Sequence, residues 1–134
     1  MKTTLKSTLV YVHDVPATSR FYQEALGLTE TMATEDGRYV QLATGDVALA
    51  FAAAEAIGEL GLPMASTTNA DSAPPVQFAF ETEDVEAAVA DFVKAGGTIV
   101  NPPTSRPWGQ VVAHLRDLNG FIIEIGSIQS EDWN

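Results

Sequence analysis

Two histidines and 18 acidic residues, with no cysteine, define the chemistry open to this chain. Without thiols there is no disulfide, no thiolate metal site and no cysteine nucleophile. His13 directly precedes the acidic Asp14, at a turn position where we expect a solvated side chain. His114 belongs to a predicted strand that pairs with the strand bearing Glu124. Whether the two side chains share one face of the sheet depends on the length of the turn between them, which the sequence leaves open.

The charge balance excludes several classes of partner. The 134 residues include 18 acids against 7 bases, a formal net charge of −11. A surface this acidic repels phosphate backbones and anionic lipids, so we expect neither a nucleic-acid partner nor a membrane partner. Cationic ligands are attracted, although solubility alone accounts for such a charge. The acidic stretch 81–86 has an equally plain explanation, because carboxylates in a first helical turn complement the helix dipole.

Size and hydropathy favour one compact cytoplasmic domain over residues 1–134. With 46% hydrophobic residues, the chain has enough apolar material for a core. The start MKTTLKSTLVYVHD lacks the long apolar stretch of a signal peptide. No segment approaches the roughly 18 apolar residues of a membrane span.

The first half of the chain predicts a strand, a helix and three further strands. Asp14 is placed to cap the helix, and Pro16 lies in its first turn, where a missing N–H costs nothing. Gly27 ends the helix, and turn residues separate the strands that follow. The predicted strands are residues 5–12, 28–33, 38–43 and 47–53.

The same order of elements recurs after residue 75. An offset of 70 residues carries Asp14 to Asp84 and Gly27 to Gly97, and an offset of 75 carries Gly45 to Gly120. We therefore predict a duplicated βαβββ unit. Its copies are residues 5–53 and 76–127, joined by a surface linker at 54–75 that begins like a helix and ends polar. The strands expected in the second copy are residues 76–81, 98–100, 111–115 and 121–125.

Short motifs occur in order along both halves. They are Val12-His13-Asp14-Val15, Ser19-Arg20-Phe21-Tyr22, Leu26-Gly27-Leu28, Glu83-Asp84-Val85-Glu86-Ala87-Ala88, Ala95-Gly96-Gly97, Pro107-Trp108-Gly109, Asp117-Leu118-Asn119-Gly120 and Ile123-Glu124-Ile125. Together they resemble the vicinal oxygen chelate superfamily, which contains glyoxalase I, extradiol dioxygenases, and fosfomycin and bleomycin resistance proteins. The resemblance implies an α+β fold of paired βαβββ modules that form a curved mixed sheet with helices on the outer face, and usually a homodimer.

The resemblance also implies where a metal would be held. Metal-using members place four ligands on strands that face a central cavity, and the matching positions here are Ser7, Leu49, Gln77 and Glu124. Leucine cannot coordinate, serine is a poor neutral ligand, and one carboxylate with one amide leaves a divalent ion underbonded. We therefore expect no metal and no other cofactor.

Strand alternation within this fold predicts the lining of a small-molecule pocket. The expected residues are Tyr11, Tyr39, Leu49, Phe51, Gln77, Trp108, His114 and Glu124. Tyr39 corresponds to His114 by the offset of 75, Trp108 is a ligand contact at the rim, and Leu9 is core. Such a mainly apolar and aromatic set with few polar groups is typical of ligand sites. By the resemblance, His114 also faces the cavity and pairs with Glu124, either as acid and base, as a polar anchor for a ligand, or as a purely structural pair.

These observations predict metal-independent binding or sequestration of a small cationic or aromatic molecule, resembling bleomycin-type resistance proteins. Two alternatives stay open. One is a glyoxalase- or dioxygenase-like metalloenzyme with an atypical site made of Glu124, Gln77 and His114. The other is a structural or regulatory dimer without a ligand.

Overall fold

The computed structural model describes residues 1–129. It falls into two compact units, Met1–Ser66 and Thr67–Asn134, of which residues 130–134 lie outside the described part. The prediction of a single domain over 1–134 stays a prediction.

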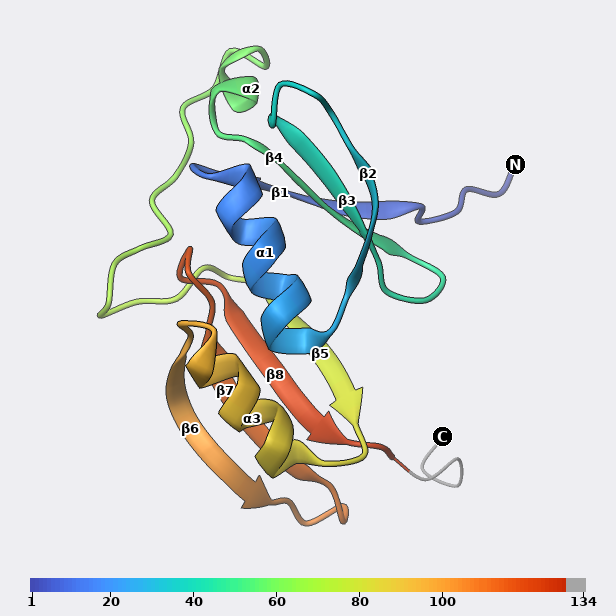
Figure 1. Ribbon diagram of the computed structural model, residues 1–134, viewed down its shortest axis with the longest axis vertical. Helices are drawn as coiled ribbons and strands as arrows, with labels where there is room; N and C mark the ends of the chain where they lie inside the picture. The colour runs from blue at the N-terminus through green and yellow to red at the C-terminus, as the bar shows by residue number, and fades with distance from the viewer. Residues whose placement is uncertain (130–134) are drawn as a thin grey trace. The chain divides into compact units, whose positions relative to one another are not determined.

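The first unit is a four-stranded sheet with a helix packed on one face (Figure 1). Its strands are ordered β1-β4-β3-β2, with β1 parallel to β4 and the other pairs antiparallel. In chain order the elements are β1 (Ser7–Val12), α1 (Val15–Leu26), β2 (Thr29–Ala33), β3 (Tyr39–Ala43), β4 (Ala48–Ala53) and the short α2 (Glu55–Gly58).

The second unit repeats this plan without the short second helix. Its sheet has the order β5-β8-β7-β6, again with only the first pair parallel. The elements are β5 (Gln77–Thr82), α3 (Val85–Lys94), β6 (Thr98–Ser105), β7 (Val111–Arg116) and β8 (Ile122–Ser127). The predicted α+β class with two βαβββ modules is thus confirmed.

Both long helices begin at the aspartates expected to cap them. The Asp14 carboxylate accepts the Ala17 N–H at 3.0 Å, and Asp84 accepts the Ala87 N–H at 3.1 Å. Each bond satisfies one of the donors that a helix leaves unpaired in its first turn. At the other end of α1, Gly27 adopts φ 69°, the left-handed conformation that glycine tolerates best.

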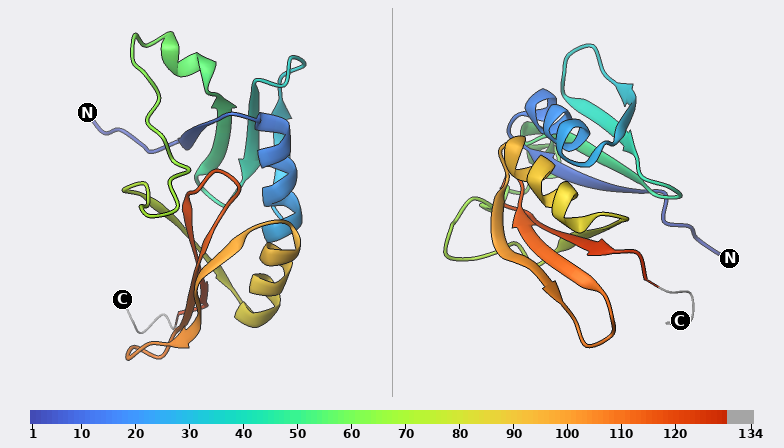
Figure 2. Two further views of the ribbon diagram at one scale, coloured as in Figure 1. Left: turned by 90° about the vertical axis from the view of Figure 1, so that its left-hand side faces the viewer. Right: turned by 60° about the horizontal axis from the view of Figure 1, so that its bottom comes forward.

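Each long helix covers one face of the sheet in its own unit (Figure 2). The core of each unit lies between that helix and that sheet. In the first unit the Tyr22 and Phe51 rings are buried, with centroids 5.0 Å apart. In the second, Phe92 of α3 is buried together with Leu115, Ile123 and Ile125 of the sheet. We call the opposite side of each sheet its distal face. On β1, Val10 and Val12 are buried on the helix side, and Leu9 on the distal face is 41% exposed. The expectation that Leu9 is core is therefore wrong.

One strand is longer than its sequence suggests. β6 continues through Pro102 and Pro103 to Ser105, whereas the predicted strand ended at Val100. It is an edge strand, and its register with β7 shifts twice, between Ile99 and Asn101 and again before Thr104. Prolines are tolerated at such positions because an edge strand leaves some N–H groups unpaired, and bulges absorb the irregularity.

The last part of the predicted linker is attached to the second unit. Thr67 Oγ1 donates to the Asn119 carbonyl at 2.6 Å, and the Arg116 guanidinium donates to the carbonyls of Gly120 and Ser72. At Gly120 a Cβ would lie 1.8 Å from the Thr67 carbonyl oxygen. Residues 67–72 therefore form a strap across the turn between β7 and β8.

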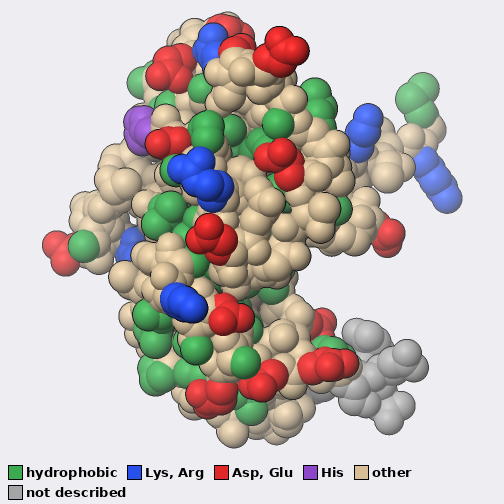
Figure 3. Space-filling view, in the orientation of Figure 1, with side chains coloured by type: hydrophobic (Ala, Val, Ile, Leu, Met, Phe, Trp, Pro, Cys, Tyr) green, Lys and Arg blue, Asp and Glu red, His purple; other side chains and the backbone are tan. Residues whose placement is uncertain are grey.

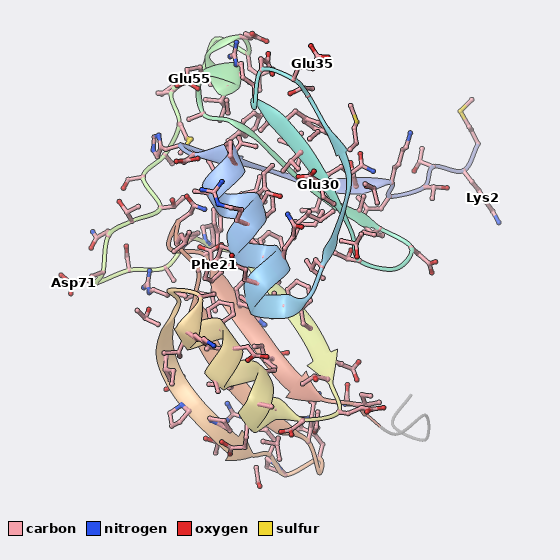
Figure 4. The ribbon with its side chains drawn as sticks, viewed as in Figure 1. Lys2, Phe21, Glu30, Glu35, Glu55 and Asp71 are labelled. Carbon is pink, nitrogen blue, oxygen red and sulfur yellow. The ribbon has the colours of Figure 1, made fainter. Side chains whose placement is uncertain are left out.

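Acidic side chains are spread over exposed turns and connections. Glu35, Glu55 and Asp71 are exposed examples from a hairpin, α2 and the strap (Figure 4). Red carboxylate groups clearly outnumber blue basic groups on the face shown in Figure 3. Within residues 1–129, no helix is long and apolar enough to cross a bilayer.

Candidate functional site

His114 and Glu124 form a pair on the distal face of the second sheet. They are direct cross-strand partners of β7 and β8, so the turn length that the sequence left open places them opposite each other. The His114 Nε2 and Glu124 Oε1 atoms are 3.2 Å apart, and the side chains are 21% and 27% exposed. The pair is thus partly shielded from water but still reachable from outside its own unit.

Gln77 joins this pair from the edge strand β5. Its Nε2 donates to Glu124 Oε1 at 3.5 Å, so the same carboxylate oxygen receives both neighbours. The other oxygen, Oε2, has no hydrogen-bond partner within residues 1–129. The carboxylate is therefore held in place on one side while the other side can still accept hydrogen bonds.

The second imidazole nitrogen of His114 has no hydrogen-bond partner among residues 1–129. Nδ1 is buried, and no described residue offers it a hydrogen bond. Because Nε2 faces the carboxylate, a tautomer protonated at Nε2 donates to Glu124 and leaves Nδ1 as an unused acceptor. Buried polar atoms without partners are uncommon and often mark a site where function takes precedence over stability.

An exposed aromatic side chain belongs to the same unit as this pair. Trp108, in the loop between β6 and β7, is 46% exposed. Its Nε1 donates to Gln110 Oε1 at 2.9 Å, and Gln110 Nε2 donates to the Ser127 carbonyl at 2.8 Å. Gln110 was not among the predicted site residues. The one signal in the sequence is its spacing, since strand alternation puts Gln110 and His114, four residues apart, on the same face.

The donors at this site do not fit a divalent transition metal. One imidazole, one carboxylate and one amide converge, and among residues 1–129 no three His, Asp or Glu side chains are grouped as a metal site would need. Imidazole and carboxylate donors that would complete a coordination shell are thus lacking among residues 67–129 of this unit.

The predicted counterpart of Glu124 in the first unit was one residue off. Ser7 pairs with Ala48 as Gln77 pairs with Ile122, so the structural offset for β4 and β8 is 74, and Glu124 corresponds to Ala50. The hairpin of the second unit is one residue longer, which shifts the register. Alanine coordinates a metal no better than leucine, so the argument against a metal is unchanged.

Leu49 and Phe51 lie on the wrong side of their strand for the predicted pocket. Both are buried, and Phe51 packs against Tyr22 of α1. β4 reads Ala-Leu-Ala-Phe-Ala-Ala and is apolar on both faces, so its sequence shows no alternation that would reveal which side meets the helix.

Tyr11 and Tyr39 lie on the distal face of the first sheet. They are the neighbours of Ala52 from the two sides, and both are half-buried. The register makes Gln41, not Tyr39, the counterpart of His114, since Gln41 pairs with Ala50. Tyr39 Oη lies 3.3 Å from Gln41 Oε1, to which it donates. His13 is exposed, as predicted, and takes no part in either face.

Two βαβββ units, each with one parallel strand pair beside a meander and one covering helix, define the vicinal oxygen chelate fold. The chain belongs to the Glyoxalase/Bleomycin resistance protein/Dioxygenase superfamily, whose family model matches residues 4–125.

The fold is shared with solved structures of low sequence identity. A glyoxalase/bleomycin resistance protein/dioxygenase family enzyme from Burkholderia phytofirmans PsJN superposes with a TM-score of 0.80, at 23% identity over 94% of this chain and 99% of that one. A glyoxalase-related enzyme from Fulvimarina pelagi also gives 0.80, at 18% identity over 95% and 89% of the two chains. Among curated proteins, the uncharacterized protein YraH of Bacillus subtilis (strain 168) is 25% identical over 115 residues, 85% of this chain and 90% of YraH.

Proposed function

We propose that this protein binds or sequesters a small cationic or aromatic organic molecule directly through Glu124, without a metal ion, in the manner of bleomycin-type resistance proteins. The observation that carries the proposal is the geometry of one carboxylate. Its Oε1 is held by His114 and Gln77, while Oε2 has no partner within residues 1–129.

A carboxylate held in this way is a good anchor for a positively charged group. Hydrogen bonds to a charged acceptor are roughly twice as strong as neutral ones. The two neighbours also restrict the Glu124 side chain before a ligand arrives, so less conformational entropy is lost on binding. The net charge of −11 attracts cations toward the protein from a distance.

Trp108 supplies an apolar surface in the same unit. Its ring is 46% exposed, so part of its surface is available to a ligand. An indole face attracts organic cations and stacks on planar rings. A ligand with both a cationic donor and a ring therefore matches the two kinds of group that this unit offers.

The test is a thermal-shift and calorimetric screen of cationic aromatic compounds, with benzamidinium as the simplest probe and benzamide as its neutral analogue. We expect benzamidinium and larger cations to bind, benzamide to bind more weakly, and Glu124→Gln to lower the affinity about tenfold or more, as for loss of a charged hydrogen bond. Glu86→Gln, an exposed carboxylate on α3, is the matched control and should leave affinity unchanged.

Two results would contradict the proposal. Stoichiometric Ni, Zn, Mn or Fe in protein purified without chelator, lost on Glu124→Ala, would favour the metalloenzyme. Absence of stabilisation by any compound, in a protein that sediments as a homodimer, would favour a structural or regulatory dimer.

A further inference from the structure

The loop that carries Trp108 is closed by its own backbone. The Arg106 N–H donates to the Gln110 carbonyl at 2.8 Å, and the Gly109 N–H donates back to the Arg106 carbonyl at 2.9 Å. Gly109 adopts φ 88°, which glycine tolerates and other residues rarely do. The backbone at position 108 is therefore well defined before any side-chain contact is considered.

The Gln110 side chain ties the indole to strand β8. Its Oε1 accepts from Trp108 Nε1 at 2.9 Å, and its Nε2 donates to the Ser127 carbonyl at 2.8 Å. An indole nitrogen can only donate and a carbonyl can only accept, so the amide has one orientation that satisfies both. Glutamine and asparagine both carry an acceptor and a donor at the end of the side chain. The asparagine side chain is one methylene group shorter.

Gly126 provides the space that this amide occupies. A Cβ at position 126 would lie 2.7 Å from Gln110 Nε2 and 3.3 Å from Gln110 Cδ. The φ of Gly126 is not in the left-handed region, so its backbone conformation does not require glycine. The residue lies two positions after Glu124 on the same face of β8, a distance of roughly 7 Å along a strand.

From these contacts we infer that Gln110 is a positioning residue for the Trp108 ring and that Gly126 is the seat for its amide. The consequence concerns ligand choice and rests on the proposed function. Because Gln110 already takes the one polar hydrogen of the indole, the exposed ring offers a ligand only apolar and π contacts. Trp108 then selects aromatic or cationic groups and gives no hydrogen bond to a ligand oxygen.

The test uses the ligand-free protein with Trp133→Phe, so that Trp108 is its single tryptophan. Acrylamide quenching and near-UV circular dichroism report how the ring is held. We expect Gln110→Ala to weaken the near-UV signal and to raise quenching, because losing one ordinary hydrogen bond changes the population of the held rotamer about fivefold. Gly126→Ala should act in the same way, since it only displaces the flexible end of Gln110.

The double variant separates this role from a general structural one. If both changes act through the same amide, Gly126→Ala has no further effect once Gln110 is alanine. Gln41→Ala, which truncates a glutamine in the other unit, is the matched control and should leave the quenching and the tryptophan band of the near-UV signal unchanged, although it removes the acceptor of the Tyr39 hydroxyl. Wild-type quenching in Gln110→Ala, or additive effects in the double variant, would overturn the inference.

Benzamidinium titration then tests the consequence for binding. We expect about fivefold weaker binding with Gln110→Ala, as for loss of one hydrogen bond, together with a smaller preference for benzamidinium over tetramethylammonium. If benzamidinium binds Gln110→Ala as tightly as wild type, the role in ligand choice is refuted. If neither benzamidinium nor any larger cation of the screen binds the wild-type protein, the proposed function fails, and the spectra still decide whether Gln110 positions Trp108.

Discussion

Replacing Gly97 by alanine should destabilise the second unit through contacts alone. Gly97 lies between α3 and β6, where its N–H donates to the Phe92 carbonyl at 3.0 Å. A Cβ there would lie 2.1 and 2.3 Å from two ring carbons of Phe92, and 3.1 Å from the Arg116 carbonyl oxygen. The φ of Gly97 is outside the left-handed region, so the added methyl group causes no backbone strain.

The size of the effect follows from how little the ring can move. To reach ordinary contact at 3.4 Å, the Phe92 ring must retreat by at least 1.3 Å from its 2.1 Å position. Phe92 is fully buried in the core under α3, so that movement displaces other side chains. Overpacking of a tight core typically costs 1–3 kcal/mol, and we expect the upper end, about 3 kcal/mol. That corresponds to a fall in the melting temperature of roughly 10 °C for a chain of this size.

Urea unfolding followed by far-UV circular dichroism measures this loss, with two glycine controls. Gly58→Ala places a methyl group in open space with an ordinary φ and should be neutral or slightly stabilising in α2. Gly27→Ala also meets nothing, but at φ 69° it should cost about 1 kcal/mol from backbone strain. A loss at Gly97 no larger than at Gly27 would refute the argument from contacts.

Four further substitutions test the fold and its electrostatics. Asp84→Ala removes the cap of α3 and should lower the free energy of unfolding by about 1 kcal/mol, measured by urea titration. Phe51→Ala should cost about 3–5 kcal/mol because the ring is buried, whereas Leu9→Ala on the distal face should stay within about 0.5 kcal/mol in the same assay. The Thr34 hydroxyl, followed by the backbone N–H of residue 38, holds the pKa of Asp36 below its ordinary value. The ionised Asp36 carboxylate therefore stabilises the folded state fully when the pH is above its pKa in the unfolded chain. This contribution is lost as the pH falls through its lower pKa in the folded protein. Thr34→Val should raise the pKa of Asp36 in an NMR titration, and an unchanged pKa would contradict the assignment.

The helices and turns could be predicted because their signals are local. Asp14, Asp84 and Gly27 act through bonds within one turn of themselves, so their residue types alone locate the helix ends. Most strand bounds came within a residue or two for the same reason. β6 was the exception, because Pro102 and Pro103 look like strand breakers unless the strand is known to lie at an edge.

The faces of the strands were predictable only where polar and apolar residues alternate. The pairing of His114 with Glu124 was expected only from the family resemblance, because the sequence left the turn length open, and the register of β7 and β8 places the two residues opposite each other. On β4, the alanines at every second position do not indicate which face of the strand meets the helix. The prediction that Leu49 lines the pocket was therefore wrong. The contact between Gln110 and Gly126 was invisible, because it depends on a missing Cβ on a different strand.

The strap at residues 67–72 determines where this chain can be lengthened or cut. Gly120 has no room for a side chain because the Thr67 carbonyl occupies that space. The conformation of the strap therefore depends on the glycine in the turn. An insertion within 67–72 would break the strap's bonds to Arg116, the last residue of β7, and to Asn119, in the turn that leads to β8. Residues 59–63, by contrast, are exposed, and their hydrogen bonds stay within the local turn after α2. A flexible insert, a protease site or new chain ends should therefore be accepted at 59–63 and rejected a few residues further on.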